Sequence, residues 1–398
     1  MTSEPTFDPT APLAGPPDPW EGAPTPSIRT GPPYHMTDMI AAEPALARRI
    51  VETLADTGGM AAQLAEAIRA TLGSGEPVVL TGCGTSEHAA LAAAEILREA
   101  ARAASLPDPI VATEQAFELS LQPPDRGLVI GITHEGATTA TNAALRAAHD
   151  AGRSTAVITV SRRSPAGSLA GIVVETDELD HGWCHTVGYL SPIVAAAAIG
   201  AHLSGRSLDA ATVEELLAAG SSDERGAERI AATLADASDL LVIASGADRP
   251  AGRELVLKVE EASWLPSAYR DLETFLHGHL PATDGSTGLV LILTDRERRA
   301  DRVARARQAL AAARVIGLRV AVIVSAEVDD KLDPALTPAG RLLVPEAPGL
   351  PGPVAALLGS ATPLQLLTER LARARGTNPD PIRRDDPVYV AASEAADG

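Results

Sequence analysis

Aromatic side chains are scarce in this sequence, at only 3% of its 398 residues. The interior must therefore be built mainly from aliphatic residues, which dominate the 45% apolar content. Basic residues are also few, because 33 lysines and arginines stand against 52 aspartates and glutamates, a formal net charge of −19. This imbalance argues against a nucleic-acid partner, which requires a basic surface. It does not exclude a phosphorylated ligand, since backbone amides can form a local anion site.

Cysteine and long apolar segments are rare as well. The two cysteines, Cys83 and Cys184, stand in unrelated contexts and form neither a disulfide framework nor a zinc motif. We find no basic segment followed by an apolar one at the start of the chain, and no apolar run of about 18 residues. We therefore expect a cytoplasmic protein without a membrane partner. No cofactor and no metal are expected, because the histidines lack the fixed spacing of a metal site.

Two stretches of the chain share a strand–turn–helix pattern. An apolar run at 128–132 leads into a turn at 133–138 that contains glycine and threonine, and a helix follows. An apolar run at 78–81 leads into Gly-Cys-Gly-Thr-Ser at 82–86, and we expect the next helix at 89–103. Such turns form pockets for an anion or a sugar, because free N–H groups and the helix dipole face the ligand.

The pattern returns about 160 residues later in the chain. The apolar run at 240–244 echoes 78–81, and the run at 288–293 echoes 128–132. An internal duplication with alternating strands and helices predicts an α/β protein with two domains, each a parallel sheet flanked by helices in three layers. The second copy lacks the glycine and the second threonine of the 133–138 turn, so the ligand is expected in the first domain. The predicted segments are a disordered proline-rich arm at 1–33, a first domain at 34–218, a second domain at 219–375 and a C-terminal tail at 376–398.

With this duplication, the pair Cys83-Gly-Thr-Ser86 and Thr133-His-Glu-Gly-Ala-Thr138 resembles the sugar isomerase (SIS) family. In detail the chain is similar to the isomerase half of glucosamine-6-phosphate synthase, from Tyr34 to Arg384. The resemblance implies two tandem SIS domains, a homodimer, and a sugar or sugar phosphate as the ligand. The synthase's glutamine-hydrolysing domain has no counterpart in the sequence, so we do not expect ammonia from glutamine.

The resemblance also implies which residues of the two turns bind the ligand. In the family, hydroxyls of these turns hold the sugar phosphate. Glu135 departs from the family pattern Ser-x-Ser-Gly-x-Thr, and its charge would repel a phosphate dianion. Either Glu135 turns outward, which we expect, or the substrate carries an amine or hydroxyl there instead. The implied binding residues are Cys83, Gly84, Thr85, Ser86, Thr133, His134, Glu135, Gly136 and Thr138, with His185 from a later loop.

The segment 254–281 resembles the family's catalytic helix and the loop that follows it. This implies Glu261 as the carboxylate that moves a proton between sugar C1 and C2, with Lys258 one turn before it. It implies His277 as the acid/base that opens the sugar ring, supplied across the dimer interface to the neighbouring subunit. These residue types suit proton transfer near neutral pH. The synthase's C-terminal lysine aligns with Pro387, so no Schiff base is expected from the tail.

These implied roles predict an enzyme that acts on a sugar or aminosugar, expected to be a phosphate. The reaction would be aldose–ketose isomerisation, deamination or deglycation through an enediol-type intermediate. One alternative is an aminosugar synthase that uses free ammonia, and another is a non-catalytic sugar-phosphate regulator. A regulator is disfavoured because the sequence contains no helix-turn-helix or basic DNA-binding segment, and because Glu261 and His277 are both present.

Overall fold

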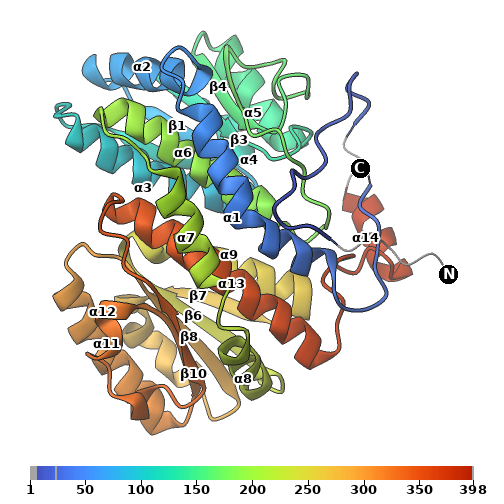
Figure 1. Cartoon of the computed structure of the whole chain (residues 1–398), viewed down its shortest axis with the longest axis vertical. Helices are drawn as coiled ribbons and strands as arrows, with labels where there is room; N and C mark the ends of the chain where they lie inside the picture. The colour runs from blue at the N-terminus through green and yellow to red at the C-terminus, as the bar shows by residue number, and fades with distance from the viewer. Residues whose placement is uncertain (1–6, 23–24, 397–398) are drawn as a thin grey trace.

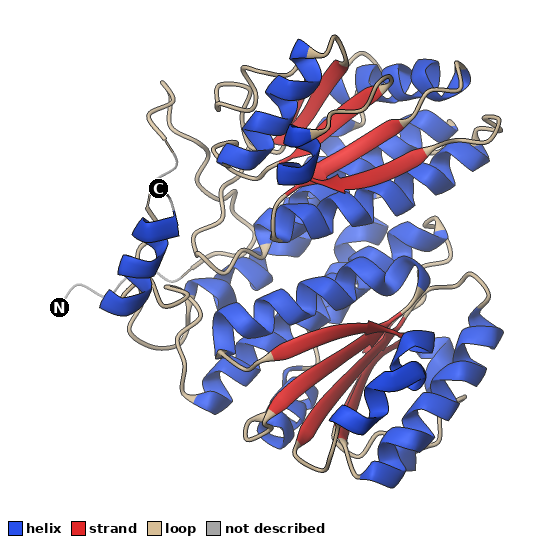
Figure 2. Cartoon of the chain, turned by 180° about the vertical axis from the view of Figure 1, so that it is seen from behind, coloured by secondary structure: helices blue, strands red, loops and turns tan. Residues whose placement is uncertain are grey.

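Two separate parallel sheets form the framework of the computed structural model, which describes residues 7–22 and 25–396. The spatial order of strands is β2-β1-β3-β4-β5 in one sheet and β7-β6-β8-β9-β10 in the other, so both follow the same order counted along the chain. Figure 2 shows the two sheets standing apart with helices around and between them. The predicted duplication and α/β class are therefore confirmed. The strands are β1 Val78–Gly82, β2 Val111–Gln115, β3 Leu128–Ile132, β4 Ser154–Thr159, β5 Ile172–Glu175, β6 Asp239–Ala244, β7 Ser267–Asp271, β8 Thr287–Leu293, β9 Arg319–Ser325 and β10 Gly340–Val344.

The central strands are buried on both faces. All five residues of β3 and all seven of β8 are buried. This is the expected result when helices cover both faces of a parallel sheet, and it explains why these strands are continuous apolar runs in the sequence. The helices are α1 His35–Leu54, α2 Met60–Gly73, α3 Thr85–Ala103, α4 Ala116–Leu121, α5 Thr139–Asp150, α6 Val187–Ser204, α7 Ala210–Gly220, α8 Glu224–Leu234, α9 Arg249–Ser263, α10 Leu272–Thr274, α11 Arg299–Ile316, α12 Ala326–Asp329, α13 Gly352–Arg375 and α14 Pro387–Ala396.

Helix α13 joins the two domains. It packs against α8 and α9 of the second domain and against α1, α6 and α7 on the other side. Figure 1 shows it running between the two sheets. Its residues from Val354 to Ala372 are buried, because neighbours surround it on all sides. The domains therefore share one continuous apolar interface and α9 is held against the first domain.

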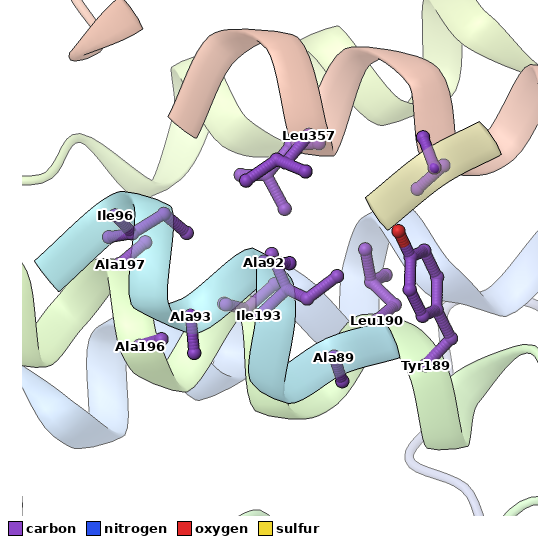
Figure 3. Close-up of a cluster of buried hydrophobic side chains, with 14 of the residues drawn as sticks. Ala89, Ala92, Ala93, Ile96, Tyr189, Leu190, Ile193, Ala196, Ala197 and Leu357 are labelled. Carbon is purple, nitrogen blue, oxygen red and sulfur yellow. The ribbon is translucent and has the colours of Figure 1, made fainter. Parts of the chain in front are cut away.

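Alanine allows α3 and α6 to pack closely in the core (Figure 3). A Cβ atom added at Gly200 of α6 would lie 3.2 Å from Ile96 Cγ2, so little room remains between the helices. Small side chains thus replace the aromatic packing that the composition excludes. The facing residues are Ala89, Ala92, Ala93 and Ile96 of α3 and Ile193, Ala196 and Ala197 of α6.

Helix α6 corrects one expectation from the sequence. It is long and apolar enough to cross a membrane by length and composition, whereas we expected no such segment. However, 83% of this 18-residue window is buried inside the protein, against α1, α2 and α3. Its apolar character is therefore explained by its place in the first domain's core.

The described part of the proline-rich arm lies along the first domain. Residues 7–22 and 25–33 contain no helix or strand. Leu13 is buried, and its N–H donates to Glu178 at 2.7 Å. Glu178 in turn accepts two hydrogen bonds from Arg49 of α1, at 2.7 and 2.8 Å. Much of the predicted disordered arm is thus in contact with the domain, while residues 1–6 and 23–24 lie outside the described residues.

A buried aspartate helps to fix the C-terminal tail. The buried carboxylate of Asp380 accepts the N–H groups of His35 and Met36, at 3.1 and 3.3 Å, at the start of α1. A carboxylate at a helix N-terminus satisfies free amides and interacts favourably with the dipole. The Asp380 carbonyl also accepts the N–H of Trp183 at 3.2 Å. The tail, α1 and the loop after β5 are therefore fastened at one point.

The buried carboxyl group of Glu43 on α1 generates a stability prediction. Its side chain is fully buried, and burial raises its pKa well above the ordinary value. Its stabilising contribution is therefore complete below the unfolded pKa of about 4.3 and is lost as the pH rises through the folded value. We expect Glu43→Gln to raise the unfolding temperature by about 2 °C at pH 8, with no gain at pH 4. Thermal unfolding at both pH values measures this.

The matched control is Glu52→Gln, which changes an exposed glutamate of the same helix. Its Tm should differ little from wild type at either pH. A Glu43→Gln variant that is equally destabilised at pH 4 and pH 8 would contradict the prediction.

Candidate active site

A cavity of about 350 Å³ lies at the carboxyl ends of β1 and β3, where the first domain meets α9. Ligands of parallel α/β sheets bind at this edge, because the turns after the strands converge there. The lining residues come from both predicted turns, the loop after β5, α9 and the C-terminal tail. They are Cys83, Gly84, Thr85, Ser86, His134, Glu135, Thr138, Trp183, His185, Gly188, Glu261, Ile382 and Arg384.

The turn after β1 is tighter than the sequence indicated. Helix α3 begins at Thr85 and not at Ala89, because Gly84 adopts a positive φ of 55° and redirects the chain at once. A Cβ at Gly82 would lie 2.6 Å from the Ser86 carbonyl oxygen, so only glycine fits there. As a result, Thr85 and Ser86 form the first turn of α3. Their position places a helix N-terminus at the cavity.

The turn after β3 is closed by a second glycine. Gly136 has a φ of 73°, and a Cβ there would lie 2.1 Å from Ser164 Oγ. Thr138 precedes α5 and lines the cavity, as predicted. Thr133 is buried, and its Oγ1 lies 3.4 Å from Thr138 Oγ1. Thr133 and Gly136 therefore shape the turn, and neither belongs to the cavity lining.

The loop after β5 is organised by Asp180. Its buried carboxylate accepts the N–H groups of Gly182, Thr186 and Gly188, at 3.1, 2.8 and 3.2 Å. The Asp180 N–H donates to His134 Nε2 at 3.0 Å, which ties this loop to the turn after β3. Four hydrogen bonds through one residue hold the loop in the shape that brings His185 to the cavity.

The two cavity histidines are neutral at physiological pH. Burial lowers the pKa of His134 to about 4 and that of His185 to about 3. Since His134 Nε2 accepts a hydrogen bond, its proton is on Nδ1. Neutral imidazoles can donate and accept hydrogen bonds with sugar hydroxyls, but they do not attract an anion by charge. In the described chain, no three histidine, cysteine or acidic residues are grouped so as to hold a metal ion.

Glu135 lines the cavity, which overturns our expectation that it turns outward. Burial raises the pKa of Glu135, and the nearby Asp180 adds to the rise. The guanidinium of Arg384 acts in the opposite direction. Within the described residues the Glu135 carboxylate has no hydrogen-bonded or ion-paired partner. The carboxylate remains available to a ligand in the cavity.

A buried ammonium group stands behind the cavity. Lys258 is completely buried, with Nζ 2.5 Å from Glu261 Oε2 and 3.7 Å from Glu254 Oε1. Burial alone would lower the pKa of Lys258, but the two carboxylates outweigh it and the pKa is raised. Glu261 also accepts a weak hydrogen bond from Cys184 Sγ at 3.6 Å. Glu261 lines the cavity, whereas the buried Lys258 lies behind Glu261 and forms an ion pair with it.

Glu254 extends this network into the first domain. It is fully buried, accepts a hydrogen bond from Thr85 Oγ1 at 3.3 Å and lies 2.7 Å from His88 Nδ1. Burial by itself would raise the pKa of Glu254, but Lys258 and His88 outweigh burial and the pKa is lowered. The sequence analysis gave Glu254 no role. Its i, i+4 spacing to Lys258 was the available signal.

His277 lies away from the cavity of its own chain. Its side chain is 68% exposed, and its Nε2 lies 2.7 Å from Glu273 Oε1. It lies at a kink in the segment Phe275–His279, where His277 has non-helical backbone angles and Gly278 has a φ of 99°. The structure therefore brings Glu261 to the predicted ligand turns but leaves His277 on the surface of the single chain.

Four lining residues were missed from the sequence: Trp183, Gly188, Ile382 and Arg384. The scarcity of tryptophan was the signal for Trp183, because an aromatic residue in a polar loop is unusual for this composition. Arg384 was missed because the resemblance gave the tail no binding residue, and the one role considered there was that of the lysine that aligns with Pro387. The tail reaches the cavity through Ile382 and Arg384.

The fold is shared with proteins of known structure. No family model matches the chain. The solved C-terminal domain of glucosamine-fructose-6-phosphate aminotransferase from Francisella tularensis superposes with a TM-score of 0.76 at 18% identity, covering 89% of this chain and 99% of that one. The chain has the tandem SIS fold. The tagatose-6-phosphate ketose/aldose isomerase of Escherichia coli shares this SIS fold, with a TM-score of 0.67 at 17% identity over 90% of this chain and 97% of that chain.

The sequence relatives agree with the SIS fold. Glutamine–fructose-6-phosphate aminotransferase (isomerizing) of Methanothermobacter thermautotrophicus is 27% identical over 314 residues, 78% of this chain and 50% of the relative. The same enzyme of Gloeobacter violaceus is 27% identical over 329 residues, 77% of this chain and 51% of the relative. The chain spans about half the length of these curated relatives. The predicted resemblance to the isomerase half is thus confirmed.

The neutral cavity histidines predict how stability depends on pH. Their pKa values of about 4 and 3 in the folded protein lie below the unfolded value of about 6.5. The unfolded chain therefore binds protons at a higher pH than the folded protein does. The free energy of unfolding that these histidines contribute above pH 6.5 is lost as the pH falls toward 4. We expect the Tm to fall over this window and His185→Gln to reduce the slope. Thermal unfolding between pH 7.5 and 4 measures it, with His149→Gln at the exposed end of α5 as control. Equal slopes in the two variants would contradict the assignment.

Proposed function

We propose that this protein binds a sugar or aminosugar in the cavity between the turns after β1 and β3 and α9, and moves a proton between sugar C1 and C2. The observation that carries the proposal is the position of Glu261. Its carboxylate lines the same cavity as Thr85 and Ser86, and Lys258 Nζ lies 2.5 Å from Glu261 Oε2. A positioned carboxylate of this kind is a suitable general base for a proton α to a carbonyl.

The chemistry requires one group that takes a proton and returns it. Glu261 removes the proton from C2 of an open-chain aldose, and the electrons of that C–H bond form the C1=C2 double bond as the carbonyl oxygen gains a proton. Return of the proton to C1, with loss of the O2–H proton as the C2=O bond forms, gives the ketose and balances the proton gained by O1. For a 2-amino sugar the same shift gives an imine at C2, which water hydrolyses to a ketose and ammonia.

The related proteins support this reaction class. Solved structures with the same fold include a glucosamine-6-phosphate deaminase from Thermotoga maritima, with a TM-score of 0.61 at 15% identity over 87% of this chain and 97% of that chain. The names of the relatives thus cover isomerisation, deamination and amino transfer of phosphorylated hexoses. We propose that this chain catalyses the step that these three reactions share, which is the proton transfer at C1 and C2.

The proposal predicts the effect of Glu261→Gln, which keeps the shape of the side chain and removes the base. Ligands are first found by thermal shift with hexoses, hexosamines, fructosamines and their phosphates. Proton transfer is then followed by NMR as loss of the C1 or C2 proton signal in D₂O. We expect the exchange rate of the variant to fall by roughly 10² or more, with binding retained.

The control is Glu260→Gln, which changes the neighbouring exposed carboxylate of the same helix. It should exchange at the wild-type rate. Binding of a sugar by the wild type without any exchange would instead support a non-catalytic regulator, and product formation only with added ammonium would support an aminosugar synthase.

We further propose that the protein is a homodimer in which His277 serves the partner's cavity. In support, His277 is exposed and does not line the cavity of its own chain, as far as the described residues extend. A ring-opening acid/base must lie within hydrogen-bond reach of the sugar. A second chain is the simplest way to bring it there.

Mixing two inactive variants tests this arrangement. Glu261→Gln and His277→Asn homodimers should each be strongly impaired, because each lacks one group in both sites. After unfolding and refolding together, mixed dimers contain one site with both groups intact, so we expect turnover to recover to about a quarter of the wild-type value for random pairing. If mixed dimers form but turnover does not recover, His277 acts in its own chain's site or takes no part in the reaction.

A further inference from the structure

Arg384 is the one cation of the cavity wall in the described part of the chain. The other lining side chains that could carry positive charge are His134 and His185, and burial keeps both neutral at pH 7. Lys258 lies behind the wall and is held by Glu261 and Glu254. An anionic group that enters this cavity therefore has a single charged partner.

The tail is shaped to present this arginine. Asp380 anchors it to the start of α1, and the next residues turn sharply, since Ile382 and Arg383 have positive φ values of 42° and 62°. Such conformations are unfavourable for non-glycine residues and persist where the surroundings impose them, often at ligand sites. Ile382 and Arg384 consequently both line the cavity.

The guanidinium of Arg384 is oriented but not neutralised. Its Cζ lies over the Trp183 ring, 3.8 Å from the ring centroid, and Trp183 is itself held by a backbone hydrogen bond to Asp380. Across the residues that the structure covers, the guanidinium makes no ion pair and no side-chain hydrogen bond. Stacking on the ring leaves the N–H groups at its edge free to donate, and they suit a carboxylate or phosphate.

We propose that Arg384 binds the anionic group, phosphate or carboxylate, of the sugar ligand. This inference rests on the proposed function for the sugar part of the ligand. The anion is then held by the C-terminal tail and not by the turn after β3. The reducing end of the sugar then lies at Glu261, and the C-terminal tail determines which sugars bind.

Glu135 disfavours an anion at the turn after β3. Its carboxylate stands in the turn whose amides and hydroxyls, from Thr138 and the start of α5, would otherwise attract a phosphate. Two like charges a few ångströms apart repel each other strongly in a poorly screened cavity. The turn therefore suits a hydroxyl or amine of the sugar, which can donate a hydrogen bond to Glu135.

Four probes, measured by isothermal titration calorimetry, test the inference. Glucosamine and glucosamine 6-phosphate differ by a phosphate, and N-fructosylglycine supplies a carboxylate. Inorganic phosphate tests the anion site without any sugar. We expect at least one anionic sugar to bind the wild type about ten-fold more tightly than glucosamine, and comparison of the phosphate with the carboxylate identifies the anion.

Arg384→Gln should abolish that preference, and a thermal unfolding transition like that of the wild type shows that the variant is folded. Arg384→Lys keeps the charge but loses the flat stacking surface over Trp183, so it should retain part of the preference. The matched control is Arg383→Gln, because Arg383 stacks on Trp264 and Tyr389 at 3.9 and 4.5 Å and is outside the cavity lining. It should retain the full preference.

Two results would overturn the inference. One is a preference for anionic sugars that survives in Arg384→Gln, which would place the anion at the start of α5. The other is glucosamine binding at least as tightly as both anionic sugars. If no sugar binds, the proposed function fails and inorganic phosphate alone tests the inference. Phosphate binding by the wild type that is lost in Arg384→Gln supports the inference. Phosphate binding that is absent in the wild type, or unchanged in the variant, overturns the inference.

Discussion

The buried ammonium of Lys258 is the interaction on which this site depends. It lies between Glu254 and Glu261 on the helix that brings the second domain to the first. An isolated charge at this depth would be strongly unfavourable, so the two carboxylates stabilise the charged form of Lys258. Because Glu254 continues to Thr85 and His88, the position of the base is tied to the ligand turn of the other domain.

Two further buried carboxylates shape the cavity without belonging to its lining. Asp180 collects three backbone amides of the loop after β5, and Asp380 collects two at the start of α1. In each case the carboxylate accepts hydrogen bonds from backbone amides that have no carbonyl partner in an irregular segment. The loop and the tail can therefore be irregular and still well defined. The scarce aromatic residues are used here, since two of the three tryptophans stack under Arg383 and Arg384.

The fold was predictable because its signals are local. A parallel strand covered on both faces must be apolar throughout, and β3 was placed at 128–132, where the structure has it. The duplication was visible for the same reason, since two such strands recur at one offset. The start of α3 was misplaced because Gly84 ends the turn through its backbone conformation and no side chain caps the helix.

By itself the sequence predicted the two-sheet architecture from its repeated strands, and its resemblance to the SIS family indicated most of the residues that line the cavity. It also placed Lys258 beside Glu261, since residues three apart lie on the same face of a helix. The tertiary structure alone decided that Glu135 lines the cavity, that Thr133 is buried behind it, and that the tail contributes Arg384. These features depend on contacts between segments far apart in the chain, such as Asp380 with α1, and no local pattern encodes such contacts.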